Sequence, residues 1–240
     1  MAPARHTRWD CLLLLAFSMS LGAQTAAAAE QPIDVIARLA TAQRDAAHKT
    51  AKASPAVMWL KPLRAGVTTH VTPGNFTLEQ KNKMFTPHLL VVPVGSNVAF
   101  PNADPFFHNV FSLFDGRRFD LGLYEAGSSR SVVFRREGVS YIFCNIHSEM
   151  SAVVIALSTP YYGIADTQGV FRLKGVPSGE YDLHVWIEGQ RQSSLDRLTR
   201  RVKIDEQSAD LGEFSVGLPE QLQHLNKFGQ PYEPDTRPPY

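Results

Sequence analysis

The chain has 240 residues, of which 44% are hydrophobic and 20% charged, and its formal net charge is +1. This composition is typical of a globular protein, and the length allows two small domains. Because basic and acidic residues almost balance, the sequence offers no broad basic surface, and nucleic-acid binding is not expected.

Residues 1–29 have the three parts of a secretory signal peptide. Arg5 and Arg8 precede an apolar run at residues 11–21, and small residues follow up to Ala29. The apolar run is too short to span a bilayer comfortably. We therefore expect a cleaved Sec-type signal, a periplasmic or secreted protein, and no stable membrane insertion after cleavage.

Residues 30–54 predict one amphipathic N-terminal helix. Apolar residues lie at helical spacing in its first half, at Ile33, Ile36, Leu39 and Ala40. Pro32 suits a first helical turn. Residues 55–74 then contain a short apolar strand, Ala56–Leu60, and a polar linker.

Residues 75–158 have the pattern of an all-β domain. Short apolar runs, such as 89–94 and 98–100, alternate with turn residues rich in glycine, serine and aspartate. Many short strands with frequent turns are typical of an antiparallel sandwich. We expect residues 115–130 to be the longest irregular piece of this domain.

One stretch of this domain combines three side chains that bind soft metal ions. Cys144, His147 and Met150 lie at intervals of three, between strand-like runs at 139–143 and 152–157. A thiolate and a thioether together with imidazole select copper, and a trigonal His₂Cys set with a weak axial Met is the blue-copper geometry. The remaining ligand must come from elsewhere, and His108 is the best candidate.

The cysteine count supports a metal ligand. Cys11 lies in the signal peptide, so Cys144 is the one cysteine of the mature chain. It has no partner for an internal disulfide, and an unprotected exposed thiol would oxidise in an exported protein. An inert core cysteine is the alternative, and the spacing to His147 and Met150 favours the metal ligand.

This ligand pattern, together with residues 85–104 and 127–134, resembles the cupredoxins, and amicyanin- and plastocyanin-like proteins in particular. The resemblance covers residues 75–158. It implies a Greek-key β-sandwich that binds one type 1 copper ion. The ligands that it implies are His108, Cys144, His147 and Met150.

The resemblance also implies roles for residues beside the ligands. Asn109 matches the position whose side chain ties the two ligand-bearing loops together near the cysteine sulfur. Ile146 departs from the amicyanin-like pattern, which usually has proline there. We expect an apolar patch around the solvent-facing edge of His147, where a redox protein partner would dock, made of Pro105, Phe106, Phe107 and Ile146.

Residues 159–217 resemble a carboxypeptidase-regulatory-like, transthyretin-type β-sandwich module. The resemblance rests on two Gly-containing turns, 166–169 and 176–179, and on the alternating strand at 181–187. The module lacks visible first strands, so we expect Ala56–Leu60 to complete its sheet and the copper domain to be inserted into it. Residues 218–240 are polar and proline-rich and predict a mostly disordered tail.

The sequence therefore predicts an exported mononuclear copper protein that carries single electrons between redox partners. Copper sequestration or delivery without catalytic activity is the alternative, and a structural interaction role of the second module is a third hypothesis. The sequence contains no credible Ser/His/Asp constellation or phosphate-binding glycine loop. An enzyme is therefore not expected.

Overall fold

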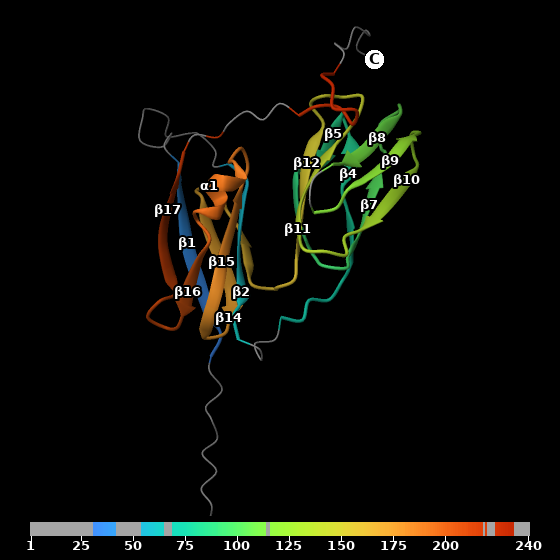
Figure 1. The fold of residues 1–240 in the computed structure, drawn as a ribbon. Coiled ribbons are helices and arrows are strands. Elements are labelled where there is room, and N and C mark those ends of the chain that lie inside the picture. The colour runs from blue at the N-terminus through green and yellow to red at the C-terminus, as the bar shows by residue number, and fades with distance from the viewer. Residues whose placement is uncertain are drawn as a thin grey trace, which may run out of the picture. The chain divides into compact units, whose positions relative to one another are not determined.

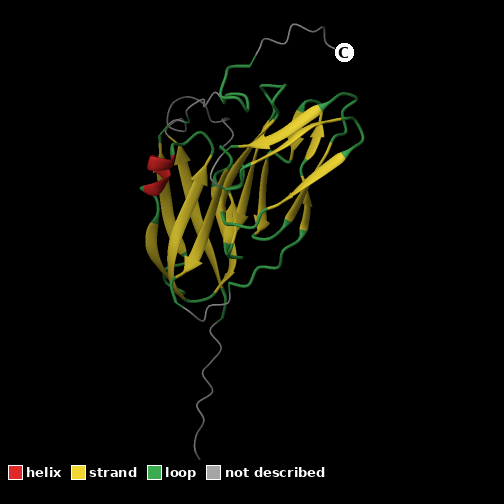
Figure 2. Ribbon diagram, turned by 45° about the vertical axis from the view of Figure 1, so that its right-hand side comes forward, coloured by secondary structure: helices red, strands yellow, loops and turns green. Residues whose placement is uncertain are grey.

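The computed structural model describes residues 31–41, 54–64, 69–113, 116–217, 219 and 224–232, so the predicted signal peptide lies outside the described residues. Nearly all regular structure is β-strand, which confirms the predicted all-β class (Figure 2). Among the described residues, α1 (Gln192–Asp196) is the one helix. In this part of the chain, no helix is both long and apolar enough to cross a membrane.

Strands from the two ends of the described chain form one sandwich, which we call the split sandwich (Figure 1). Its two sheets have the strand orders β14-β1-β17 and β13-β2-β15-β16, and their buried apolar side chains share one cluster. The bounds are β1 (Ile33–Thr41), β2 (Ala56–Pro62), β13 (Tyr162–Ile164), β14 (Val170–Val176), β15 (Gly179–Ile187), β16 (Arg200–Ile204) and β17 (Asp210–Val216).

Strands β3–β12 form the middle sandwich (Figure 1). Its sheets have the orders β10-β7-β3 and β6-β12-β11-β8-β9, and β4 and β5 form a short hairpin. The bounds are β3 (Asn75–Thr77), β4 (Glu79–Lys81), β5 (Met84–Thr86), β6 (Leu89–Pro93), β7 (Asn97–Pro101), β8 (His108–Ser112), β9 (Phe119–Tyr124), β10 (Ser129–Val133), β11 (Gly138–Phe143) and β12 (Ser151–Leu157).

Strand β12 is buried on both faces. Alternate residues from Ala152 to Ala156 belong to the core of the middle sandwich, and alternate residues from Val153 to Leu157 belong to the apolar cluster of the split sandwich. A strand with two buried faces needs apolar residues at every position. This double burial explains the uninterrupted apolar run in the sequence.

Strand β2 precedes the middle sandwich in the sequence but pairs with strands that follow it. Trp59 pairs with Tyr162 of β13 on one side and with His184 of β15 on the other. This pairing confirms the prediction that Ala56–Leu60 completes the sheet of the C-terminal strands. The strand order therefore places the middle sandwich as an insertion between β2 and β13.

The two ends of the middle sandwich meet at one turn. The amide of Asn97 donates to the carbonyl of Gly74, 2.9 Å away, just before β3 begins. The amide of Val94 donates to the carbonyl of Leu157, also 2.9 Å away, where β12 ends. The turn between β6 and β7 thus fixes the chain both where it enters and where it leaves this sandwich.

The predicted N-terminal helix is wrong over residues 33–41, which form strand β1. Its buried residues alternate, at Ile33, Val35, Ala37 and Leu39, which is the period of a strand and not of a helix. Pairing with β14 on one side and β17 on the other decides between the two periods. Residues 42–53 of the predicted helix lie outside the described residues.

Residues 115–130 are more regular than expected, because β9 and the first part of β10 lie there. Gly122 in β9 has a positive φ of 69°, and the register between β8 and β9 shifts between Asn109 and Phe111. A bulged strand that contains glycine lacks clean alternation of apolar and polar residues. That irregularity is why the sequence pattern did not reveal β9.

Candidate metal centre

The loop from Cys144 to Met150 connects two neighbouring antiparallel strands, β11 and β12. Phe143 pairs with Ser151 at the last rung of the ladder, so the loop leaves and re-enters the sheet at adjacent positions. Inside the loop, the Cys144 amide donates to the Met150 carbonyl and the Met150 amide donates to the His147 carbonyl, each over 3.2 Å. These two bonds close the seven residues into a compact turn.

His108 begins β8, which pairs with β11 through Phe111 and Phe143. This neighbouring strand brings His108 to the loop: its Nδ1 lies 3.8 Å from the Cys144 sulfur, and Nδ1 of His147 lies 3.6 Å from the same atom. The ligand atoms of the three residues all lie within 4.8 Å of one another. The structure thus brings together three of the four predicted ligands.

Asp104 orients the imidazole of His108. Its Oδ2 lies 2.8 Å from Nε2 of His108, and both side chains are almost completely buried. A carboxylate accepts hydrogen bonds, so Nε2 carries the proton and Nδ1 keeps a lone pair directed at the cysteine sulfur. Burial lowers the pKa of His108 more than Asp104 raises it, which favours the neutral ring that a metal requires.

The same carboxylate is bonded to the β4–β5 turn. The amides of Asn82 and Lys83 donate to the two Asp104 oxygens over 2.6 and 2.9 Å. Burial acts to raise the pKa of Asp104, but these amides and the His108 ring together hold it below its usual value. Sequence reasoning missed Asp104, although its spacing of four residues from His108 was a usable signal.

Cys144 is a free and fully buried thiol. Burial raises the pKa of this thiol, and hydrogen bonds from the backbone amides of Asn109, Ile146 and His147 act in the opposite direction. Donors directed at the sulfur favour its thiolate form. These amides offset the effect of burial only in part, and the pKa of the thiol stays above its usual value.

Asn109 differs in part from its expected role. Its side-chain amide donates to Oδ1 of Asp120 on β9, over 2.8 Å, and its side-chain oxygen has no partner. The contact with Cys144 is made by the backbone amide instead. Asn109 thus lies beside the sulfur as expected, but its side chain does not tie the two loops together directly.

Met150 is fully buried in the same core cluster as Cys144. Its backbone amide and carbonyl both bond to other residues of the loop. The thioether therefore belongs to the buried interior of the sandwich beneath the loop. Its service as a ligand stays a prediction.

The two phenylalanines of the predicted apolar patch differ in position: the ring of Phe106 lies against the site, and the ring of Phe107 faces outward. The Phe106 ring lies 5.2 Å from the His108 ring and 5.7 Å from the His147 ring, between centroids. Phe107 is 55% exposed, so its ring faces outward as expected for a residue of the predicted apolar patch. Ile146 is only partly buried and packs on the core of the middle sandwich. An apolar surface thus adjoins the partly buried His147.

Residues 224–232, predicted to be part of a disordered tail, lie against the loop instead. His224 and Tyr232 bond to the carbonyls of Ser148 and Cys144. Isolated histidine and tyrosine residues in a proline-rich segment carry no periodic signal, so sequence reasoning missed this contact. The rest of the predicted tail, apart from residue 219, lies outside the described residues.

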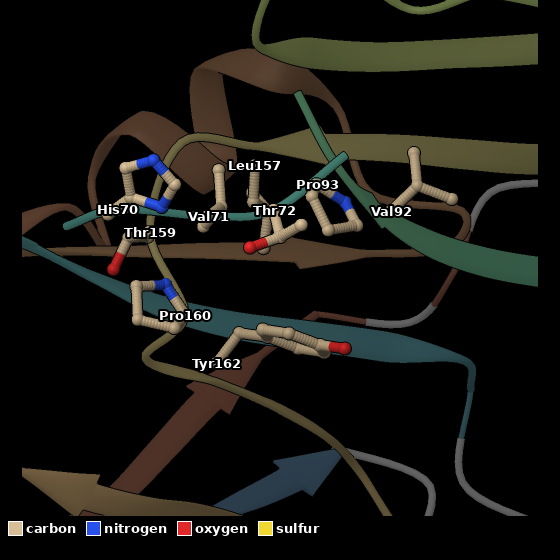
Figure 3. A pocket seen from close by; sticks show the side chains of 9 residues that line it. All are labelled: His70, Val71, Thr72, Val92, Pro93, Leu157, Thr159, Pro160 and Tyr162. Atoms are coloured by element: carbon tan, nitrogen blue, oxygen red, sulfur yellow. The ribbon is translucent and has the colours of Figure 1, made fainter. Parts of the chain in front are cut away.

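A pocket shown in Figure 3 lies at one end of β12. Leu157 and Pro93, which line it, are paired residues at the ends of β12 and β6. The ligand loop adjoins the opposite end of β12, at Ser151. The pocket, of about 200 Å³, is lined mainly by apolar side chains and by the connecting segment at residues 70–72.

No protein-family model matches the sequence, and the comparison with curated proteins returns no match. Among solved structures, the chain is similar to a purple cupredoxin from Nitrosopumilus maritimus, with 24% identity over 34% of this chain and 98% of that chain, at a TM-score of 0.31. A reduced amicyanin variant has 19% identity over 42% of this chain and 98% of its own, at a TM-score of 0.33.

A copper-containing nitrite reductase from Thermus scotoductus SA-01 is similar as well, with 22% identity over 40% of this chain and a TM-score of 0.34. The match spans 25% of that longer chain. All three similarities cover less than half of the present chain, at low TM-scores.

Proposed function

We propose that this chain is an exported mononuclear type 1 copper protein that carries single electrons between redox partners. The observation that carries the proposal is the cluster of the Cys144 sulfur with Nδ1 of His108 and His147, at 3.8 and 3.6 Å. One thiolate and two imidazoles, with a thioether nearby, form the donor set that selects copper in electron-transfer proteins.

The donor set fits a metal ion. Two atoms that each lie about 2.0–2.3 Å from one ion, at tetrahedral or trigonal angles, are roughly 3.5–3.8 Å apart. The two sulfur–nitrogen distances have this size. Both imidazoles present the nitrogen atom nearer to the backbone, and Asp104 holds His108 in the tautomer that binds metal.

The protein contributes fixed ligands. Copper, when bound, would take up and release one electron at a potential set by its ligands. His108 is held by β8 and Asp104, and Cys144 by the end of β11 and by the backbone bonds of the loop. Ligands that keep one arrangement in both oxidation states reduce the reorganisation that slows electron transfer. Met150 is proposed as the weak axial ligand because of its burial beside Cys144.

The proposed partner is a redox protein that docks near His147. This residue lies in the loop and is partly buried, and the exposed Phe107 lies in the segment that leads to His108. Apolar surface beside a partly buried ligand suits brief contact with another protein. Export is proposed from the signal sequence. Burial shields the free thiol of Cys144 from oxidants, which is compatible with an oxidising compartment.

The identity of the split sandwich as a carboxypeptidase-regulatory-like module stays a prediction, as do the predicted domain boundaries. The pairing of β2 with β13 and β15 is compatible with that identity and does not depend on it.

The test is the visible spectrum and voltammetry of the purified chain after loading with one equivalent of Cu(II). We expect an intense band from thiolate-to-copper charge transfer and a reversible one-electron wave. Cys144→Ser is the matched control, because serine keeps the size of the side chain and removes the soft donor. A band of equal intensity in this variant would contradict the site.

Copper sequestration or delivery is the alternative outcome of the same measurements. It predicts tight Cu(I) binding without reversible cycling and without electron exchange with a redox partner. The burial of Cys144 and His108 favours a retained metal over one that is handed on.

A further inference from the structure

Residues 224–232 form a segment, here called the strap, that lies on the ligand loop (red in Figure 1). Nε2 of His224 lies 2.7 Å from the carbonyl oxygen of Ser148. The Tyr232 hydroxyl lies 2.8 Å from the carbonyl oxygen of Cys144. Carbonyl oxygens only accept, so His224 and Tyr232 are the donors.

The two strap rings also pack on the strand that leads into the loop. The His224 ring stacks on Phe143 with centroids 4.0 Å apart and an angle of 22° between the planes. The Tyr232 ring meets the His224 ring edge to face, at 5.2 Å. The residue before Cys144 and the carbonyl of Cys144 itself are thus contacted from the same side by one segment.

Lys227 connects the strap to both ligand-bearing elements. Its amide donates to Oδ1 of Asn145 in the loop, over 2.9 Å, and its Nζ lies 2.7 Å from Oδ2 of Asp120. The other oxygen of Asp120 accepts from the side chain of Asn109, the residue after His108. The strap therefore bridges the loop and the element that supplies the other imidazole.

The strap adds to the few hydrogen bonds that the loop makes within itself. The loop's two internal backbone bonds are both long, at 3.2 Å, and Ser148 and Glu149 are exposed. No proline restricts φ at residue 146, which is isoleucine. Three hydrogen bonds from the strap reach Cys144, Asn145 and Ser148, which is nearly half of the loop.

We propose that the strap is a working part of the metal centre, in which Tyr232 and His224 are positioning residues that fix the ligand loop through the backbone of Cys144 and Ser148. This inference rests on the proposed function for its meaning, since a fixed loop matters most for a metal whose ligands must not rearrange. The hydrogen bonds of His224 and Tyr232 to the loop end on backbone carbonyls, so these residues act through the geometry of the loop backbone.

The sharpest perturbation is Tyr232→Phe, which removes the hydroxyl and keeps the ring on His224. The hydroxyl also lies 3.2 Å from Nδ1 of His224, so the substitution removes this contact as well as the bond to Cys144. Loss of the hydrogen bond to the Cys144 carbonyl alone costs about 1 kcal/mol, which corresponds to roughly a fivefold change in a local opening equilibrium. We expect the metal-free variant to show about fivefold faster reaction of the Cys144 thiol with a thiol reagent, and similarly faster amide exchange at Cys144 and Met150. Tyr162→Phe makes the same chemical change in the split sandwich and serves as the matched control.

The copper-loaded variant provides an independent readout. We expect Tyr232→Phe to bind one copper ion, to lose it to an excess of chelator about fivefold faster, and to change the relative intensities of its visible bands. A chain that ends at residue 223 should show the same changes more strongly. Far-ultraviolet circular dichroism checks that the sheets remain.

The results separate the two proposals. If wild-type protein takes up no copper or shows no charge-transfer band, the proposed function fails, while the thiol and amide exchange rates still test the strap. If wild type shows the band, and Tyr232→Phe matches wild type in thiol reactivity, amide exchange rate and visible spectrum, the strap contacts the loop without fixing its geometry. That result overturns the inference. Should the shortened chain fail to fold, the single-atom variant decides.

Discussion

Asp104→Ala is the most informative single substitution for the site. The Asp104 carboxylate accepts three hydrogen bonds, from the amides of Asn82 and Lys83 and from Nε2 of His108. At about 1 kcal/mol each, their loss should lower the free energy of unfolding of the metal-free protein by about 3 kcal/mol. Denaturant unfolding followed by circular dichroism measures this change.

The same substitution should weaken metal binding. Without the carboxylate, the proton of His108 is no longer confined to Nε2, and the lone pair of Nδ1 is less often directed at the site. Loss of such a partner of a metal-binding histidine typically costs about 10- to 100-fold in affinity. Chelator competition measures the affinity, and Asp104→Asn should fall between alanine and wild type because its amide offers one acceptor oxygen instead of two.

Asp166→Ala is the matched control for Asp104→Ala. Asp166 also accepts from two amides and one side chain, those of Gln168, Val170 and Arg172, but it lies in an exposed turn of the split sandwich. We expect a smaller loss of stability and unchanged copper affinity. If Asp104→Ala binds copper as tightly as Asp166→Ala, the carboxylate does not orient His108, and the reasoning from its burial is refuted.

Three further outcomes are expected. Met150→Leu should keep the copper and the colour and raise the reduction potential. Met150→Gln should lower the reduction potential, since an amide oxygen is a harder donor that favours Cu(II). If voltammetry shows that both variants shift the potential in the same direction, Met150 is not the axial ligand. Tyr141→Phe should leave Trp186 Nε1 without its acceptor at 3.1 Å and lower the free energy of unfolding by about 1 kcal/mol, with an unchanged copper spectrum. The hydrogen bond to Glu188 raises the pKa of His88 in the folded protein above its usual value. The pair therefore stabilises the fold fully at pH values below the ordinary histidine pKa of about 6.5. This stabilisation is lost as the pH rises through the pKa of His88 in the folded protein. The melting temperature of His88→Gln should therefore be lower than that of wild type at pH 5 and equal to it at pH 9.

Three of the proposed ligands could be singled out from the sequence because they lie at regular, short spacing. Cys144, His147 and Met150 lie in one loop, and strands that flank a loop are visible as apolar runs. His108 was the best candidate for the remaining ligand and was also implied by the family resemblance, but its approach to the loop depends on the neighbouring positions of β8 and β11. Hydrogen bonds between distant segments leave no such pattern, and for that reason the strap was missed.

The error at β1 has a different physical origin. The segment contains both a helical set, with Ile36, and an alternating set, with Val35 and Ala37. An isolated segment of this length does not decide between them, because most of its stability comes from tertiary packing. The decision is made by β14 and β17, which lie more than a hundred residues further along the chain.

The turn that joins the two ends of the middle sandwich bears on how the protein folds. Strand β2 pairs with β13 and β15, which follow the middle sandwich in the sequence. Long-range pairing of this kind is slow because a large loop has to close first. Once Gly74 and Leu157 are both bonded to the turn at residues 94–97, the loop between β2 and β13 shortens from about a hundred residues to about twenty. The loop-closure relation gives this shortening a free energy of about 1.4 kcal/mol. If the middle sandwich folds before β2 pairs with β13 and β15, the entropy cost of completing the sheet of the split sandwich is therefore smaller.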